Sequence, residues 1–394
     1  MAGPFDTPAA LRHAFRGRHA SGPDPDQMTR RQPPTRRSRS SDPQPSRAPT
    51  VRQVARHARV STATVSRVVS GSRFVSPEVA ARVWAAIREL DYRPNHVARN
   101  LRVRTTSTVG VIIPDIQNPF FTSVVRGIEA GLQERRFTLL LANSDGDPER
   151  ERGCIESLCA ERVAGLLIVP SQSDGKIYER LARHGPPIVA LDRSPANLDV
   201  DQVRVTNEEG ARSAVRHLAS LGWTRIAFIG GPGEANVAVD RERGYRQALA
   251  EAGLTVDPSL IQRADFKEDG GYRAMTALLN GPVRPRAVFV ANNLMAMGAL
   301  HAIGDAGLRV PEDIALALFD DIPWAARLHP PLTAVAQPTY DLGLSAARLL
   351  LERLRDPHRP VRHLVLQTTL VVRASCGVEL VRGTAGRRPA TDPA

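Results

Sequence analysis

The chain has 394 residues, enough for two or three domains, and 42% of them are hydrophobic, so a large core is possible. No apolar run approaches the ~18 residues of a membrane-spanning helix, and no apolar secretory signal begins the chain, so we expect a cytoplasmic protein without a membrane partner. The three cysteines, Cys154, Cys159 and Cys376, have neither metal-binding spacing nor a disulfide framework. We expect no metal and no cofactor.

The net charge of +12 is unevenly spread. Residues 1–49 carry +5, residues 50–104 carry +8, residues 377–394 carry +1, and the large remainder carries −2. The positive charge is thus concentrated in the N-terminal part of the chain, and the rest is nearly neutral. This distribution indicates a nucleic-acid-binding domain attached to a domain of another kind.

Residues 1–49 are rich in Pro, Arg, Ser and Asp and poor in apolar residues, which predicts a disordered basic extension. Two interpretations stay open: a flexible arm that adds non-specific affinity for DNA, or a segment without a role, with Met28 as an alternative start. The tail at 377–394 is also expected to be disordered.

Three short amphipathic helices are predicted between residues 50 and 94. Thr50 can cap the first, Ser61 the second, and Ser76-Pro77 opens the third. The first two, joined by a short turn, fit a helix-turn-helix, whose second helix enters the major groove of DNA. The alternative is a three-helix packing module with a solvated basic face. The outward side chains of the second helix are small or polar, as close approach to base edges requires: Thr62, Ala63, Ser66 and Arg67.

This segment resembles the headpiece of the LacI/GalR family of transcriptional regulators. The matching residues keep the spacing of the family without a gap: Val54-Ala55, Val60-Ser61, Thr64-Val65-Ser66-Arg67-Val68, Val75-Ser76, Arg82-Val83, Ala86-Ile87, Tyr92-Arg93-Pro94-Asn95 and Ala98-Arg99. The resemblance implies a hinge helix within 95–106 that forms on DNA and inserts Leu101 into the minor groove, bending the duplex. A plain linker is the alternative. The DNA-binding residues implied are Thr50, Ser61, Thr62, Ala63, Thr64, Ser66, Arg67, Asn95, Ala98 and Leu101.

Beyond residue 106 the pattern changes to alternating strands and helices. Apolar strands separated by amphipathic helices imply parallel sheets covered on both faces. Their number suggests two doubly wound α/β units, roughly 107–205 and 206–335. Strands are predicted at 108–113, 137–142, 164–169, 187–191, 225–229, 286–290 and 314–319, with a late strand or strand pair at 363–373.

Polar groups follow the carboxyl ends of nearly all these strands, where ligands of α/β sheets bind. The family resemblance continues here, through Pro114-Asp115, Asn118-Pro119-Phe120-Phe121, Asp192-Arg193, Arg243-Gly244-Tyr245 and Phe319-Asp320-Asp321. It implies that 107–376 is a two-lobed effector-binding and dimerisation domain of periplasmic-binding-protein type. The effector contacts carried over by position are Phe120, Phe121, Asp192, Arg193, Arg241, Asn292 and Asp320.

Each of these side chains also has a simpler interpretation. Asn118 and Asn292 can be helix caps, the Asp192–Arg193 pair can be a surface ion pair, and the phenylalanines can belong to the core. Taken together at one sheet edge, the set favours contact with a ligand.

Four positions depart from the family pattern. Arg59 stands in the turn of the helix-turn-helix, where Gly is usual, and Gln53 replaces an Asp of the first helix. Asn293 replaces the usual Asp after Asn292, which removes a charge near the cleft. Ala235 stands where the purine-responsive member carries Arg, which argues against a purine effector.

The motifs of common enzyme classes are missing: no G-x-G-x-x-G, P-loop, H-E-x-x-H or G-x-S-x-G occurs, so we expect no catalytic site. A solute-binding receptor with the same two lobes is the alternative, but it would not carry a helix-turn-helix. The sequence thus predicts a transcriptional repressor that binds a palindromic operator as a dimer. The Asp, Arg and Asn side chains suggest a sugar or sugar derivative as effector.

Overall fold

The computed structural model describes residues 49–69, 74–92, 106–171, 176–195 and 198–380. The chain divides into two units, Met1–Asn95 and His96–Ala394, and each is described by itself. The predicted N-terminal extension, hinge helix and C-terminal tail lie almost entirely outside the described residues. No helix in the described ranges has the length and apolar character needed to cross a membrane.

The described part of the first unit contains three helices, and the predicted caps of the second and third are formed. Ser61 Oγ accepts from Thr64 N at 3.0 Å, and Ser76 Oγ accepts from Val79 N at 3.4 Å. At Thr50 the contact is reversed, since its backbone N–H donates to Gln53 Oε1 at 2.7 Å. The helices are α1 (Val51–His57), α2 (Thr62–Val69) and α3 (Pro77–Glu89), and they pack on a small core that includes Val54, Val65, Val83 and Ile87.

The turn between α1 and α2 has the geometry of a helix-turn-helix despite its bulky residue. Arg59 adopts a φ of +54°, the left-handed conformation that Gly fills most easily. Val60 N then bonds back to Ala55 O at 2.9 Å, which ends α1 and directs the chain into α2.

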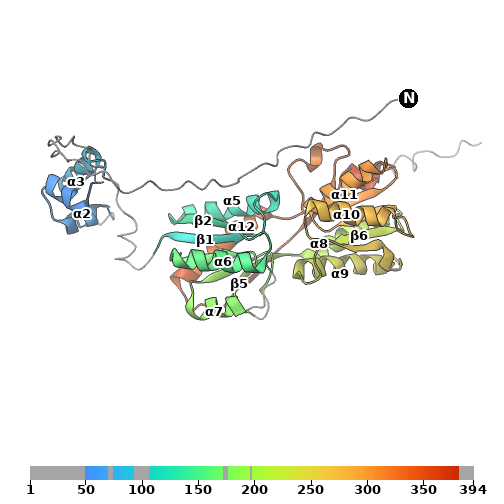
Figure 1. Cartoon of the computed structure of the whole chain (residues 1–394), viewed down its shortest axis with the longest axis horizontal. Helices are drawn as coiled ribbons and strands as arrows, with labels where there is room; N and C mark the ends of the chain where they lie inside the picture. The colour runs from blue at the N-terminus through green and yellow to red at the C-terminus, as the bar shows by residue number, and fades with distance from the viewer. Residues whose placement is uncertain (1–48, 70–73, 93–105, 172–175, 196–197, 381–394) are drawn as a thin grey trace, which may run out of the picture. The chain divides into compact units, whose positions relative to one another are not determined.

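The second unit consists of two lobes, each built on a six-stranded sheet (Figure 1). Strand order is β11-β5-β4-β3-β1-β2 in lobe 1 and β12-β10-β9-β8-β6-β7 in lobe 2. β12 runs antiparallel to β10, and the other pairings are parallel, as predicted. Lobe 1 holds β1 (Thr108–Ile113), β2 (Thr138–Asn143), β3 (Gly165–Ile168), β4 (Ile188–Leu191), β5 (Asp201–Val205) and β11 (His363–Leu366). Lobe 2 holds β6 (Ile226–Gly230), β7 (Ile261–Arg263), β8 (Ala287–Val290), β9 (Ala315–Phe319), β10 (Thr333–Ala336) and β12 (Thr369–Val371).

Helices cover both faces of each sheet. In lobe 1, α5 and α12 lie on one face and α6 and α7 on the other; in lobe 2, α10 and α11 lie opposite α8 and α9 (Figure 1). Their bounds are α5 (Pro119–Gln133), α6 (Pro148–Ala160), α7 (Lys176–His184), α8 (Asn207–Ser220), α9 (Asn236–Glu251), α10 (Glu268–Leu279), α11 (Asn293–Asp305) and α12 (Thr339–Arg355).

The chain passes between the lobes three times, after β5, β10 and β11. It therefore returns to lobe 1 for α12 and β11, which the sequence pattern did not assign to either lobe. The close packing of α12 against α5 depends on two glycines. A Cβ on Gly127 would lie 2.0 Å from Tyr340 O, and one on Gly343 would lie 2.0 Å from Val124 O.

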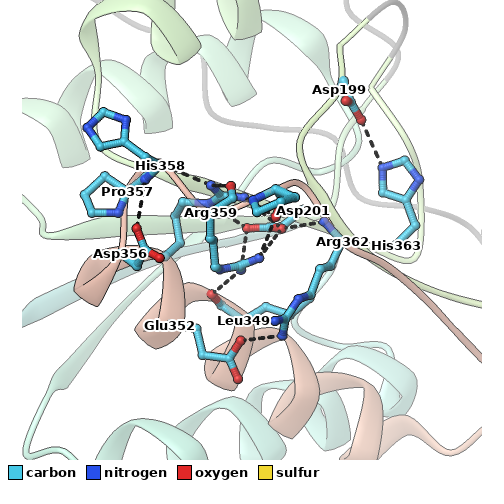
Figure 2. Close-up of polar contacts among 12 residues, drawn as sticks. Asp199, Asp201, Leu349, Glu352, Asp356, Pro357, His358, Arg359, Arg362 and His363 are labelled. Atoms are coloured by element: carbon cyan, nitrogen blue, oxygen red, sulfur yellow. Dashed lines mark hydrogen bonds and ion pairs between the residues drawn. The ribbon is translucent and has the colours of Figure 1, made fainter.

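A buried carboxylate attaches the end of α12 to the sheet of lobe 1 (Figure 2). Asp201, at the start of β5, accepts from Arg353 Nε at 2.9 Å and from Arg359 Nη2 at 2.7 Å. It also accepts from Arg362 N at 2.9 Å, just before β11. Asp201 is 1% exposed, and each guanidinium bonds both of its oxygens. The start of β5 is thus joined to the segment from the end of α12 to β11, about 150 residues further along the chain, by a charge-assisted cluster.

Candidate functional site

The second helix of the first unit presents the predicted residues on its outer face. Thr62, Ala63, Ser66 and Arg67 are exposed, whereas Val65 and Val68 are buried. Thr50 and Ser61 are also exposed, and the half-buried Thr64 lies 2.9 Å from Ser61 through the two hydroxyl oxygens. The small side chains leave the α2 backbone accessible to a groove of DNA.

A cavity of about 490 Å³ lies where the carboxyl ends of strands from both sheets face one another. Both lobes contribute to its lining. The structure brings together all seven residues that the family resemblance implied as effector contacts: Phe120, Phe121, Asp192, Arg193, Arg241, Asn292 and Asp320.

Four non-glycine residues of the cavity lining have left-handed backbone conformations, the first being Asp145 with a φ of +55°. Asp192 and Asp320 follow directly on β4 and β9 with φ of +61° and +72°, and Phe266 has a φ of +64°. Such conformations are costly for residues other than Gly and gather at ligand-binding sites.

Asp192 and Arg193 form the charged part of the lobe 1 wall. The Arg193 Nε lies 3.7 Å from Asp192 Oδ2, and both side chains are largely buried. Burial lowers the pKa of Arg193, and the nearby Asp192 raises it. The Arg193 guanidinium also lies 5.5 Å from the ring centre of Phe266 in lobe 2. The interpretation as a surface ion pair was therefore wrong.

Arg241 and Asp320 form the corresponding part of lobe 2. Arg241 Nε donates to Asn207 Oδ1 at 2.8 Å and Nη1 donates to Ala291 O at 2.5 Å, which fixes its position. Asp320 accepts from Gln337 Nε2. Burial raises the pKa of Asp320, and Arg241 opposes that rise.

The remaining contacts are aromatic or amide groups. Phe120 and Phe121 pack edge to face with ring centres 4.9 Å apart, and both belong to the lobe 1 core as well as to the cavity lining. Asn118 Oδ1 accepts from Phe120 N at 3.0 Å, and Asn292 Oδ1 accepts from Met295 N at 2.9 Å. Both asparagines thus cap helices and also line the cavity.

Several buried polar atoms of the lining have no hydrogen-bond partner within the described part of the protein: Asp192 Oδ1, Arg193 Nε and Gln337 Oε1. Such atoms are costly unless a ligand or water satisfies them. The four buried charges of the cavity sum to zero, and further acids at 115, 145, 265 and 268 outnumber the one further base, Lys267. Acidic side chains therefore outnumber basic ones in the lining of the cavity.

No group of three or more His, Cys, Asp or Glu side chains is arranged to hold a metal ion in the part of the chain that is described. The three cysteines are free thiols; Cys376 is buried and the other two are partly exposed.

Comparison with known proteins connects the two units. Residues 50–95 match the bacterial regulatory proteins of the lacI family, and residues 215–376 match a periplasmic binding protein-like domain. The chain is 39% identical over 327 residues to the ribose operon repressor of Escherichia coli K12, covering 83% of this chain and 99% of the relative. This chain belongs to the LacI family.

The LacI family protein is therefore a DNA-binding transcriptional regulator and not an enzyme. It is also 35% identical to the HTH-type transcriptional repressor PurR of Aliivibrio salmonicida, over 83% of this chain and 98% of the relative. Among solved structures, the lac repressor dimer bound to operator and the anti-inducer ONPF shares 28% identity, with a TM-score of 0.75 over 84% of this chain and 99% of that one. A LacI family regulator from Enterococcus faecium with bound ribose shares 31% identity, with a TM-score of 0.61 over 68% and 98%.

Several cavity residues of this LacI family regulator were not among the predicted effector contacts, including Asn118, Phe266 and Gln337. Asn118 was interpreted as a cap, which it is, but it also faces the cavity. Phe266 and Gln337 lie in connections whose local sequence resembles any other loop. Phe266 follows the short strand β7 and Gln337 follows β10, and neither strand was predicted. Without these strands, the two residues could not be placed at the carboxyl edge of the sheet, where ligands bind.

Three predicted DNA contacts of the regulator, Asn95, Ala98 and Leu101, lie outside the described residues. Their assignment stays a prediction. Ala235, the position that argued against a purine, is 3% exposed and packs beside Phe266. This position therefore gives the described cavity no positively charged side chain.

Proposed function

We propose that this LacI family regulator is a repressor that binds a palindromic operator as a homodimer and responds to a neutral sugar of pentose size, with D-ribose as the first candidate. The observation that carries the effector class is the cavity itself, which combines two buried acid–base pairs, orphaned polar atoms and aromatic walls.

A sugar matches these groups one by one. Each hydroxyl both donates and accepts, so it can bridge Asp320 and Arg241 or Asp192 and Arg193. The apolar faces of a pyranose or furanose ring suit the rings of Phe120 and Phe266. A phosphorylated sugar would bring negative charge to a lining that already holds more acids than bases.

The relatives support the same class. The regulator from Enterococcus faecium was solved with bound ribose, and the Escherichia coli relative is a ribose operon repressor. The relation to PurR makes a purine the competing effector. The buried Ala235 offers a purine no hydrogen bond, which favours the sugar.

For DNA we propose direct contacts from α2 through Thr62, Ala63, Ser66 and Arg67, with Thr50, Ser61 and Thr64 placed for the phosphate backbone. We further propose that Asn95, Ala98 and Leu101 contact the minor groove.

We also propose that the protein is cytoplasmic, because a regulator that binds operator DNA must be in the same compartment as the chromosome.

Two apolar surfaces of the effector unit suit a second copy of the chain. The edge strand β2 exposes Leu140 and Leu141, although strands of parallel sheets are ordinarily covered on both faces. In lobe 2, a hollow is lined by the half-buried Met297, Leu300 and Leu328. We propose that both surfaces are buried in the homodimer. Leu141→Glu combined with Met297→Glu should give monomers in light scattering.

The proposed switch is a linkage between cavity and headpiece. Sugar that binds one relative arrangement of the lobes more tightly shifts the protein toward it, and the shift changes how two headpieces are held on the operator. Calorimetry with ribose, arabinose, glucose, ribose 5-phosphate and hypoxanthine tests the effector class. Binding of hypoxanthine with no response to any neutral sugar would overturn the proposal.

A further inference from the structure

Two consecutive asparagines begin α11, and the first of them caps it. Asn292 Oδ1 accepts from Met295 N at 2.9 Å, and its Nδ2 donates to Phe266 O at 3.0 Å. Asn293 is 1% exposed, and its Oδ1 accepts from the adjacent Leu294 N at 2.7 Å. The side-chain NH₂ of Asn293 is not used in the cap.

This NH₂ group reaches across to the other lobe. Asn293 Nδ2 donates to Asn118 Oδ1 at 2.9 Å, so a buried hydrogen bond joins the amino ends of α11 in lobe 2 and α5 in lobe 1. The same Asn118 oxygen accepts from Phe120 N at 3.0 Å as the cap of α5. Both lone pairs of that oxygen are therefore occupied.

The bond lies between proposed effector contacts of the two lobes. On the lobe 1 side, Asn118 lines the cavity and is bonded to Phe120. On the lobe 2 side, the backbone N–H of Asn293 bonds to the carboxylate of Asp320 and opposes the rise in its pKa. A change at Asn293 thus acts on the spacing of two walls of the cavity without removing a group from its lining.

We infer that Asn293 is a positioning residue of the effector site, which acts through Asn118 to favour the closed arrangement of the lobes. The inference rests on the proposed sugar effector. If the sugar binds only the closed arrangement, the apparent association constant is the intrinsic one multiplied by the fraction of protein that is closed. Loss of the interlobe bond lowers that fraction and therefore weakens binding.

Aspartate at 293 cannot replace the asparagine. A carboxylate offers acceptors only, and it would face the Asn118 oxygen, another acceptor. If Asn118 turned to present its NH₂ group, α5 would lose the cap bond to Phe120 N. In either orientation one buried hydrogen bond is lost, and a negative charge is added near Asp320.

The test uses the full chain with Asn293→Asp and Asn293→Ala. Asn280→Asp is the matched control, because Asn280 is exposed at the end of α10 and outside the cavity lining. Calorimetry should show D-ribose binding about five- to tenfold more weakly in both variants, the value of one buried hydrogen bond. The control should bind within about twofold of wild type, and circular dichroism should show all four proteins folded.

Small-angle X-ray scattering gives a second readout that a purely local defect would not move. Ligand-free variants should have a larger radius of gyration than ligand-free wild type, because their lobes open more often. Wild-type affinity in both variants would overturn the role of Asn293 and leave the sugar effector intact. If wild type binds no neutral sugar, the proposed function fails by itself. In that case the scattering still tests the inference: an unchanged radius of gyration in both ligand-free variants would show that the interlobe hydrogen bond does not hold the lobes closed.

Discussion

Arg241 Nη1 lies 3.8 Å from Asp320 Oδ2 within lobe 2, and both side chains are buried. The distance is that of an ion pair without a hydrogen bond, because Arg241 directs its bonds to Asn207 and Ala291. A ligand hydroxyl can accept from the guanidinium and donate to the carboxylate. The pair is thus held in place by the protein, with hydrogen-bonding capacity left for an effector.

Asp320→Asn should abolish the effector response and leave operator binding intact. The amide keeps the shape but removes the charge that faces Arg241, and a hydrogen bond to a charged group contributes about 1.5–3 kcal/mol. We expect ribose to bind at least about tenfold more weakly in calorimetry. Asp321→Asn is the matched control, since Asp321 pairs with Arg373 and lies outside the cavity lining. A normal response of the Asp320 variant would show that the site is assigned wrongly.

Sugar affinity should fall in mild acid. Burial raises the pKa of Asp320 above the ordinary 3.8, although Arg241 lowers it and Asp192 raises it further. Because the folded pKa is raised, Asp320 takes up its proton at a higher pH than an exposed aspartate does as the solution is acidified. A protonated Asp320 leaves Arg241 uncompensated and offers one acceptor fewer. Calorimetry between neutral pH and mild acid should show this loss in wild type, and Asp320→Asn should show a weaker dependence.

Much of the lobe architecture could be predicted because its strands are continuous apolar runs. β1 was predicted with its observed bounds, and β8 and β9 within one residue. β5 was missed because it begins with Asp201-Gln202, polar residues that are buried by partners elsewhere in the chain. No local pattern could show that Arg353, far along the chain, makes Asp201 acceptable in a core. The cavity residue Gln337 was missed for the same reason, since the fold alone brings it to Asp320.

Replacing Asp201 should destabilise lobe 1 severely. Asp201→Asn leaves the guanidinium groups of Arg353 and Arg359 buried without a counter-charge, and breaking a buried pair in this way costs about 3–5 kcal/mol. The matched control is Asp199→Asn, two residues earlier, where the exposed carboxylate lies 3.2 Å from His363 (Figure 2). An exposed pair is worth about 0–1 kcal/mol. Urea denaturation of both variants measures the difference, and equal losses would show that the buried cluster is not a stabilising contact.

Arg67→Ala should reduce specific operator binding more than binding to unrelated DNA. Arg67 is exposed near the end of α2, and a side chain that reads a base pair contributes about 1–3 kcal/mol of discrimination. Arg126→Ala removes the same charge from lobe 1 and controls for net charge. Mobility-shift titrations with operator and with scrambled DNA, at fixed salt, separate the two effects. Equal losses on both DNAs would assign Arg67 to the phosphate backbone instead.

Arg59→Gly should stabilise the headpiece. The φ of +54° at Arg59 costs a residue with a Cβ about 1–2 kcal/mol, and Gly avoids that cost while losing about 0.5–1 kcal/mol through its greater freedom in the unfolded chain. We expect a net gain of about 0.5–1 kcal/mol in the opening free energy of the α1 and α2 amides, measured by hydrogen exchange of the full chain. Arg56→Gly provides the opposite control, because Arg56 is an exposed residue inside α1, where Gly costs about 1 kcal/mol. If the opening free energy rises in Arg59→Gly and falls in Arg56→Gly, the left-handed turn, and not the loss of an arginine, determines the change. A fall in both variants would contradict the left-handed turn.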